Sequence, residues 1–369
     1  MAITPLPWQG ELYKALMSLE AELPNGLLIY GPGGIGTIEL VIEYAKSLFC
    51  TQPEANGAAC GHCKGCVMAR ANTHPDLRFI VSEAESLPRH IPFEAPSNAG
   101  KDRKIYREIL IHQPRALTDF LNLAAHENDG RRIIIVYPAD ALRADAASVL
   151  LKSLEEPPAR TSFILVADDI DRVLPTIRSR CRLLRAGAPT REQALAWLAQ
   201  QGQADPESAL SLVNGAVYRI KTQQAVLDDP DLDAKTREQL LQYCALSAPL
   251  REALLNRLML GARLRLDDLA LKEGKSNVPV SAALPVLEQW GYDLLRVKSG
   301  LSAHYFSAYQ AQLAQVAAAM NLEHIYAWCD NLKVLRKSVN HPLNAQLVIE
   351  QCLLSYRRLA AGQKPESLR

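Results

Sequence analysis

The chain has 369 residues, enough for two or three domains, and its 48% hydrophobic and 22% charged residues are typical of a globular protein. This composition excludes a collagen-like or wholly disordered chain. The 41 Lys and Arg residues nearly balance the 40 Asp and Glu residues, which leaves a net charge of +1. A chain this balanced has no bulk attraction for nucleic acid or an anionic membrane, so contact with DNA would need a local patch or a partner.

The sequence shows no sign of a membrane or export segment. No apolar run approaches the length of a membrane span, and the first twenty residues lack a basic start followed by an apolar stretch. We therefore expect a cytoplasmic protein. Short basic groups such as Arg131–Arg132 have no interleaved aromatic residues, so a solvated surface is favoured over a DNA-binding one.

Strand-like runs alternate with helical patterns in the first half, as in a parallel sheet covered by helices. The expected strands are Leu27–Tyr30, Leu77–Val81, Arg132–Val136, Ser162–Ala167 and Cys181–Leu184. The expected helices are Ile38–Leu48, Ala116–His126 and Asp145–Leu154. The run from Ile133 to Val136 is apolar without alternation, which predicts a central strand buried on both faces. The segment from Ser82 to Lys104 has three prolines and no periodicity, which predicts a long exposed loop.

A loop with four glycines joins the first expected strand to the first expected helix. Its candidate phosphate-binding residues are Gly31, Gly33, Gly34, Gly36 and Thr37. The spacing is that of a P-loop, in which Lys and then Ser or Thr follow the last glycine. Here Thr37 replaces the lysine that neutralises phosphates, and Ile38 replaces the hydroxyl that binds magnesium. We expect a degenerate phosphate loop that can offer N–H groups to an anion but does not hydrolyse nucleotide. A glycine-rich turn unrelated to nucleotides is the alternative.

A second departure concerns the acidic residue that active P-loop enzymes carry after a hydrophobic strand to help hold magnesium. The strand ending at Val136 is followed by Tyr137 and Pro138 instead. Asp140 lies slightly further on, where we expect it to serve a turn or a helix cap. Both departures favour a site without ATPase activity.

A cluster of four cysteines lies within seventeen residues: Cys50, Cys60, Cys63 and Cys66. Four thiolates suit a tetrahedral structural zinc ion with no open position. An iron–sulfur cluster is the competing metal site, although the Cys followed by Pro that is typical of ferredoxins is absent. Free thiols are the third possibility. His62 is expected to be a solvent-facing turn residue rather than a ligand.

Beyond Pro189 the strand signals stop, and the rest of the chain predicts helices. The clearest are Ala282–Val297, Ala308–Met320, Leu322–Leu335 and Leu343–Leu359. An acidic break around Pro230 separates two helical parts. We predict a sheet domain over residues 1–187 with a metal-binding insertion at 50–66, a small helical domain over 188–232 and a larger helical domain over 233–369.

Three segments resemble the clamp-loader branch of the AAA+ family. They are Leu151–Pro158 (LKSLEEPP), Phe163–Ala167 (FILVA) and Ile177–Cys181 (IRSRC). The resemblance is strong over about residues 25–185 and weak beyond. It implies an α/β fold in which an AAA+ sheet domain of the P-loop type is followed by a small helical lid domain and an all-α collar domain for oligomerisation.

The resemblance also implies a function. The chain would be a subunit without ATPase activity in the clamp loader of a bacterial DNA-directed DNA polymerase, supporting ATP-dependent loading of the sliding clamp onto primed DNA. Its partners would be motor subunits of the gamma or tau type and a delta-type subunit. Arg180 would be an arginine finger that reaches into the nucleotide site of the neighbouring subunit and stabilises charge on the transferring phosphoryl group. From the residues alone, Arg178 and Arg182 are equal candidates.

Two further positions bear on the choice between an inactive and an active subunit. Ala167 stands where motor subunits carry Thr or Ser to sense the γ-phosphate, and Arg219 lies one residue from the place of a nucleotide-contacting arginine, so that role is not transferred to it. Two alternatives stay open: an active motor subunit of the gamma or tau type, and a zinc-dependent DNA-binding module.

Overall fold

The computed structural model describes residues 3–54, 58–97, 100, 103–122, 131–213, 215–244, 248–273, 276–278, 280–338 and 344–367. The chain divides into two compact units, Met1–Pro206 with Ala216–Thr236 and Glu207–Gly215 with Arg237–Arg369. Each unit is built around hydrophobic clusters of its own.

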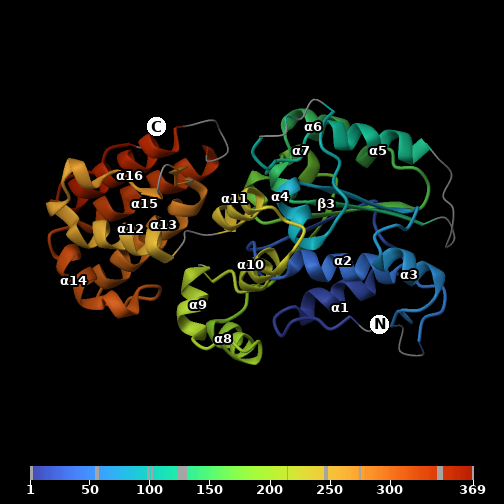
Figure 1. Ribbon diagram of the computed structural model, residues 1–369, viewed down its shortest axis with the longest axis horizontal. Helices are drawn as coiled ribbons and strands as arrows, with labels where there is room; N and C mark the ends of the chain where they lie inside the picture. Colours follow the sequence, from blue (N-terminus) through green and yellow to red (C-terminus); the bar gives the residue numbers. More distant parts are fainter. Residues whose placement is uncertain are drawn as a thin grey trace. The chain divides into compact units, whose positions relative to one another are not determined.

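The first unit contains a parallel sheet of five strands in the order β2-β3-β4-β1-β5 (Figure 1). The strands are β1 (Gly26–Tyr30), β2 (Leu77–Val81), β3 (Arg132–Tyr137), β4 (Thr161–Ala167) and β5 (Arg182–Arg185). Their bounds confirm the five predicted strands to within one residue at each end. Every residue of β3 is buried, as its unbroken apolar run predicts.

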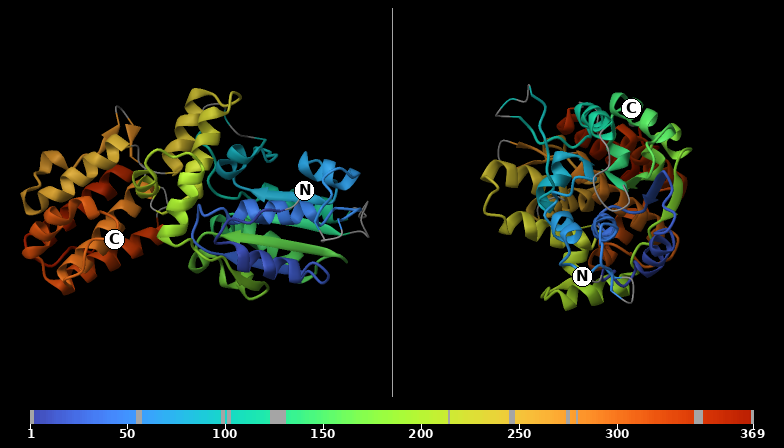
Figure 2. Two further views of the ribbon diagram at one scale, coloured as in Figure 1. Left: turned by 90° about the horizontal axis from the view of Figure 1, so that it is seen from below. Right: turned by 90° about the vertical axis from the view of Figure 1, so that its right-hand side faces the viewer.

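Helices cover both faces of this sheet. On one face lie α1 (Gly10–Ser18) and α2 (Thr37–Ser47); on the other lie α5 (His112–Asn122) and α6 (Ala144–Glu155) (Figure 1). Figure 2, left, looks onto the face that α1 and α2 cross. Successive side chains of β3 serve the two faces in turn, because Ile133 and Ile135 pack beneath α1 and α2 whereas Ile134 and Val136 pack on the other side.

The predicted helices of this unit are confirmed with small shifts. The helices α2 and α6 begin and end within one residue of the prediction. Helix α5 begins at His112, four residues earlier than predicted, and residues 123–126 of that prediction lie outside the described part of the chain. Other helices of the unit are α3 (Lys64–Arg70), α7 (Pro175–Arg178), α8 (Arg191–Gln200) and α10 (Tyr218–Asp228).

The prediction of a continuous loop from Ser82 to Lys104 is wrong at its start. Helix α4 (Glu83–Ser86) and a 3₁₀ turn (Leu87–Arg89) occupy it. The Nη1 and Nη2 atoms of Arg103 donate to the Glu83 carboxylate at 2.5 and 2.7 Å. This ion pair joins residues twenty apart and orders the segment. The periodicity of apolar residues cannot predict such a pair. Residues 98, 99, 101 and 102 lie outside the described ranges.

The second unit is a helical bundle around buried aromatic residues. Trp290 donates from Nε1 to the Tyr356 hydroxyl at 2.8 Å, and that hydroxyl donates to the Leu258 carbonyl at 2.8 Å. The helices are α12 (Ala248–Leu260), α13 (Val280–Lys298), α14 (Gln310–Ala318), α15 (Leu322–Ser338) and α16 (Ala345–Ala360), with α9 (Pro206–Leu212) and α11 (Ala234–Cys244) preceding them in the chain. They confirm the four predicted helices; Leu343, the predicted start of the last, lies outside the described residues.

The expectation that strands stop after Pro189 is wrong in one place. Two antiparallel strands of two residues each, β6 (Lys272–Glu273) and β7 (Ser276–Asn277), form a hairpin between α12 and α13. Strands this short leave no alternation to detect. The predicted fold class, an α/β parallel-sheet domain followed by helical segments, is confirmed. Among the described helices, none combines the length and apolar character needed to cross a membrane.

Candidate functional site

The glycine loop lies between the end of β1 and the start of α2, as the spacing predicts. Gly34 and Gly36 have φ angles of +72° and +84°, and Gly36 directly precedes α2. Residues with a β-carbon rarely adopt these angles, which explains the glycines. The Gly31 N–H donates to the Ala167 carbonyl of the neighbouring strand at 3.2 Å. The loop therefore curls over the amino end of an eleven-residue helix, the place where phosphate loops bind anions.

The two positions that depart from the P-loop pattern are the first two residues of helix α2. Thr37 and Ile38 are both buried, and neither side chain carries a charge. The Thr37 hydroxyl has no hydrogen-bond partner among the described residues. The loop thus keeps the shape of a phosphate site but has neither a cation nor a magnesium ligand at the usual positions.

Residues distant in sequence hold the carbonyl groups of the loop. Trp8 donates from Nε1 to the Ile35 carbonyl at 2.9 Å, and Gln9 donates from Nε2 to the Gly36 carbonyl at 2.7 Å. The Tyr218 N–H, at the start of α10, donates to the Gly34 carbonyl at 2.9 Å. Three separate donors therefore fix the loop from outside its own segment.

A carboxyl group lies directly against the loop. Asp168 follows β4, and a β-carbon on Gly33 would lie 2.6 Å from its Cγ atom, so a larger residue there would require the Asp168 side chain to move. The Asp168 N–H donates to Asp140 Oδ1 at 2.9 Å, and its Oδ1 accepts from the Tyr137 hydroxyl at 3.5 Å. Asp140 lies in a single 3₁₀ turn (Ala139–Ala141), in accord with the expected turn role.

The surroundings of Asp168 favour its neutral form. Burial and the nearby Asp140 and Glu85 carboxylates raise the pKa of Asp168 to about 8, against the opposing effect of Arg219 and Arg89. Burial also raises the pKa of Asp140. Two adjacent carboxyl groups with raised pKa values thus lie beside the loop.

This pKa shift predicts a pH-dependent contribution to stability. Because the folded-state pKa is about 8 and an unfolded Asp titrates near 3.8, the folded chain keeps a proton that the unfolded chain releases between those values. The contribution is fully present below the unfolded pKa and falls as pH rises, by up to about 1.4 kcal/mol per pH unit. Urea unfolding between pH 5 and 8 should show the stability of wild type falling relative to Asp168→Asn. Parallel curves would contradict the shift.

Arg219, the second residue of α10, reaches the next glycine of the loop. A β-carbon on Gly34 would lie 2.6 Å from Arg219 Cγ and 2.8 Å from its Nε. No role was predicted for Arg219 from the sequence, because it lies one residue from the position expected for a nucleotide-contacting arginine. No role was predicted for Asp168 either. The only sequence signals were the closeness of Arg219 to the expected position and the place of Asp168 directly after a strand.

Arg180 lies just after α7, on the surface. Its Nη1 donates to the Thr176 carbonyl at 2.9 Å, and its Nη2 forms an ion pair with the Glu155 carboxylate. The side chain is 36% exposed. Arg178 is also exposed and has Nη1 4.0 Å from the Asp171 carboxylate. Arg180 therefore offers a guanidinium that is accessible and held in place from within the chain.

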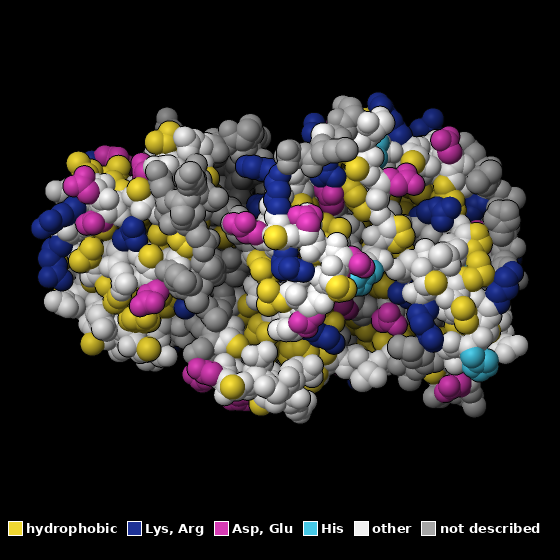
Figure 3. Space-filling view, viewed as in Figure 1, with side chains coloured by type: hydrophobic (Ala, Val, Ile, Leu, Met, Phe, Trp, Pro, Cys, Tyr) yellow, Lys and Arg dark blue, Asp and Glu magenta, His cyan; other side chains and the backbone are white. Residues whose placement is uncertain are grey.

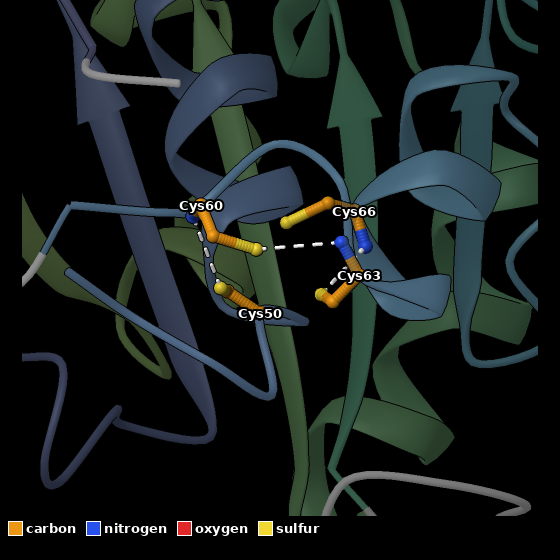
Figure 4. A group of neighbouring side chains, drawn as sticks. All are labelled: Cys50, Cys60, Cys63 and Cys66. Carbon is orange, nitrogen blue, oxygen red and sulfur yellow. Dashed lines mark hydrogen bonds between the residues drawn. The ribbon is translucent and has the colours of Figure 1, made fainter.

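The four cysteines of the cluster converge although Cys50 lies ten residues before Cys60. Their sulfur atoms all lie within 4.8 Å of one another (Figure 4). A tetrahedral zinc ion with bonds of about 2.3 Å needs sulfurs about 3.8 Å apart, so a small closure suffices. An all-sulfur set of donors suits a soft or borderline metal rather than calcium or magnesium. These residues could hold one metal ion.

Backbone N–H groups point at the sulfurs of this cluster. The N–H groups of Cys60 and Cys63 each donate to the sulfur of the preceding cysteine, Cys50 and Cys60 respectively, at 3.3 Å. Gly61 makes the turn between them with a φ of +80°. His62 is exposed, and its Nδ1 lies 3.0 Å from the Cys60 carbonyl, in accord with a turn residue. Residues 55–57 of the insertion lie outside the described ranges.

On the face drawn in Figure 3, most Lys and Arg side chains of the described residues stand singly or in small groups among Asp, Glu and apolar side chains, and a short run of them lies at the left edge. The expectation of a solvated Arg131–Arg132 pair is wrong for Arg132, which is buried and donates from Nη1 to the Leu121 carbonyl at 2.8 Å.

The first half of the chain is similar in sequence to known proteins. Residues 9–189 match the family described as "DNA polymerase III, delta subunit". The chain is 37% identical over 204 residues to DNA polymerase III subunit delta' of Pseudomonas aeruginosa, covering 55% of each chain. It is 33% identical over 197 residues to the Escherichia coli protein of that name, covering 53% of this chain and 52% of that one. The chain spans about half the length of these relatives.

Proposed function

Because residues 9–189 match the family described as "DNA polymerase III, delta subunit", we propose that this chain is a clamp-loader subunit of the delta prime type. It takes part in ATP-dependent loading of the sliding clamp onto primed DNA without hydrolysing ATP itself. The observation that carries this proposal is the glycine loop, in which Thr37 and Ile38 replace the catalytic positions and Asp168 and Arg219 lie against Gly33 and Gly34.

The purified chain alone is expected to show no ATP turnover above a buffer blank. The loop has neither the lysine nor the following magnesium-binding hydroxyl of an active P-loop, so magnesium is not held where the γ-phosphate would be transferred. A coupled phosphate-release assay with and without magnesium measures this. Turnover that depends on magnesium would favour an active motor subunit of the gamma or tau type and would overturn the proposal.

Arg180 is the residue proposed to act in another subunit. Its guanidinium is accessible and always charged, and the Glu155 carboxylate orients it from the end of α6. A phosphate of a neighbouring subunit would compete with Glu155 for this group. The neighbours proposed are motor subunits of the gamma or tau type, with a delta-type subunit completing the assembly.

The cysteine cluster is proposed to bind structural zinc. Cys50, Cys60, Cys63 and Cys66 fill a tetrahedral shell, which leaves no position for a substrate or water. When bound, zinc would cross-link the end of α2 to the start of α3. The cluster residues fix the turn through N–H···S contacts, and their role is to hold the insertion in shape rather than to take part in a reaction.

The proposed organisation has three parts: a sheet domain over 1–187, a lid domain over 188–232 and a collar domain over 233–369. Among the residues that the structure describes, strands end at residue 185 apart from the β6–β7 hairpin, which supports the first boundary. The acidic break falls between α10 and α11, which supports the second. Replication takes place in the bacterial cytoplasm, so we propose that location.

A further inference from the structure

We propose that Asp168 closes the glycine loop to phosphate, and that the loop behind it is a latent polyphosphate site whose cation is Arg219. This inference goes beyond the clamp-loader role, because it concerns what the loop of the isolated chain can bind. It assigns the exclusion of phosphate to a single carboxyl group and predicts that the loop regains affinity when that group is removed.

The first step is steric. Asp168 lies so close to Gly33 that a β-carbon there would be 2.6 Å from its Cγ. In a phosphate loop the space over these glycines belongs to the phosphates, which the backbone N–H groups cradle. Because its side chain lies against Gly33, Asp168 would clash with a phosphate seated over these glycines.

The second step is that the loop keeps the means to bind an anion. The Thr37 hydroxyl, nine-tenths buried at the first turn of α2, has no hydrogen-bond partner in the part of the chain described. The amino end of α2 supplies a positive field. Arg219 lies against Gly34, near enough to Asp168 to oppose the rise in its pKa. The lost lysine of the loop thus has a substitute cation on α10.

The third step concerns the other charges around Asp168. Glu85 forms an ion pair with Arg89, at 2.6 Å between carboxylate and guanidinium, and Arg89 also pairs with Glu39. Asp140 accepts from the Asp168 N–H and lies 3.8 Å from Arg172 Nη1. These carboxylates are therefore already partnered, and Asp168 is the one that lies on the loop itself.

The fourth step is that the loop does not depend on Asp168 for its shape. Trp8, Gln9 and Tyr218, from other segments, donate hydrogen bonds to three of its carbonyl groups. The Asp168 N–H can still donate to Asp140 after the side chain is removed, because that bond is made by the backbone. Replacing Asp168 is thus expected to empty the site without dismantling it.

The test is titration of the full-length purified chain with sodium tripolyphosphate at pH 7 without magnesium, followed by calorimetry or ³¹P NMR. Asp168→Ala is expected to bind at least about tenfold more tightly than wild type, the scale of one charge-assisted hydrogen bond. Adding Arg219→Ala to it should return the affinity to that of wild type. Asp171→Ala, which removes an exposed carboxylate three residues further along the chain, controls for the general loss of a nearby carboxyl group and should bind as wild type does.

Folding of each variant is checked by thermal melting, and Asp168→Ser, a smaller polar replacement, is titrated alongside. Folded Asp168→Ala or Asp168→Ser that binds no more tightly than wild type overturns the proposal. An equal gain in Asp171→Ala also overturns it, because the effect would then be general charge. A gain that survives Arg219→Ala overturns the role of that arginine.

Discussion

Replacing Arg180 with alanine is expected to lower ATP turnover sharply in an assembly reconstituted with motor subunits, sliding clamp and primed DNA. An arginine supplied from a neighbour is worth on the order of 10³-fold or more in phosphoryl transfer. The loss applies only to the nucleotide site that faces this chain. The ATP turnover of the whole assembly should therefore fall by at least the fraction that this site contributes. Steady-state phosphate release with saturating clamp and DNA measures it.

Arg178→Ala is the matched control for this experiment. Arg178 is an exposed arginine two residues away and its only described ion pair is with Asp171, so its loss should leave turnover unchanged. Arg180→Lys keeps the charge but loses the planar fork, and an intermediate loss is expected. Unchanged turnover in Arg180→Ala, with the assembly intact by size-exclusion chromatography, would remove the finger role while leaving the proposed clamp-loader membership in place.

The proposed zinc site predicts that chelating the metal, or replacing Cys63 with serine, unfolds the segment from Cys50 to Arg70. Structural zinc stabilises small peptide folds by about 10 to 16 kcal/mol, and this segment has little apolar core besides the cysteines and Ala59 to replace it. Hydrogen–deuterium exchange should rise over residues 50–70 and stay unchanged over the glycine loop. Elemental analysis of the wild-type chain should give one zinc per chain.

Cys329→Ser provides the control for the cluster. Cys329 is a partly buried thiol on α15, outside the cluster, so its replacement should leave the zinc content at one per chain. Iron in the wild-type protein would favour the iron–sulfur alternative. No metal, or an exchange pattern that Cys63→Ser does not change, would contradict the structural zinc site.

The elements of the sheet were predictable because their signals are local. A run such as Ile133–Val136 specifies a strand buried on both faces without reference to the rest of the chain. The cysteine cluster was equally accessible, since three of its residues share one short spacing and Cys50 follows the first helix. In both cases the residues that define the feature are close together in sequence.

The groups that close the loop were not predictable in this way. Asp168 and Arg219 reach Gly33 and Gly34 across more than 130 residues, and no periodicity encodes a contact of that range. The same holds for the pair between Arg103 and Glu83, which orders a segment expected to be a loop. The pairing of Arg180 with Glu155 depends on how α6 and α7 pack, so a finger candidate could be named but not its partner.

The most direct test of the central claim is to mix the purified chain with the motor and delta-type subunits of its own organism and measure the mass of the product and its ATP turnover. We expect a defined assembly containing this chain, with turnover stimulated by the sliding clamp and primed DNA, and much lower stimulation when the chain is omitted. A chain that stays apart from these subunits and hydrolyses ATP by itself would contradict the account.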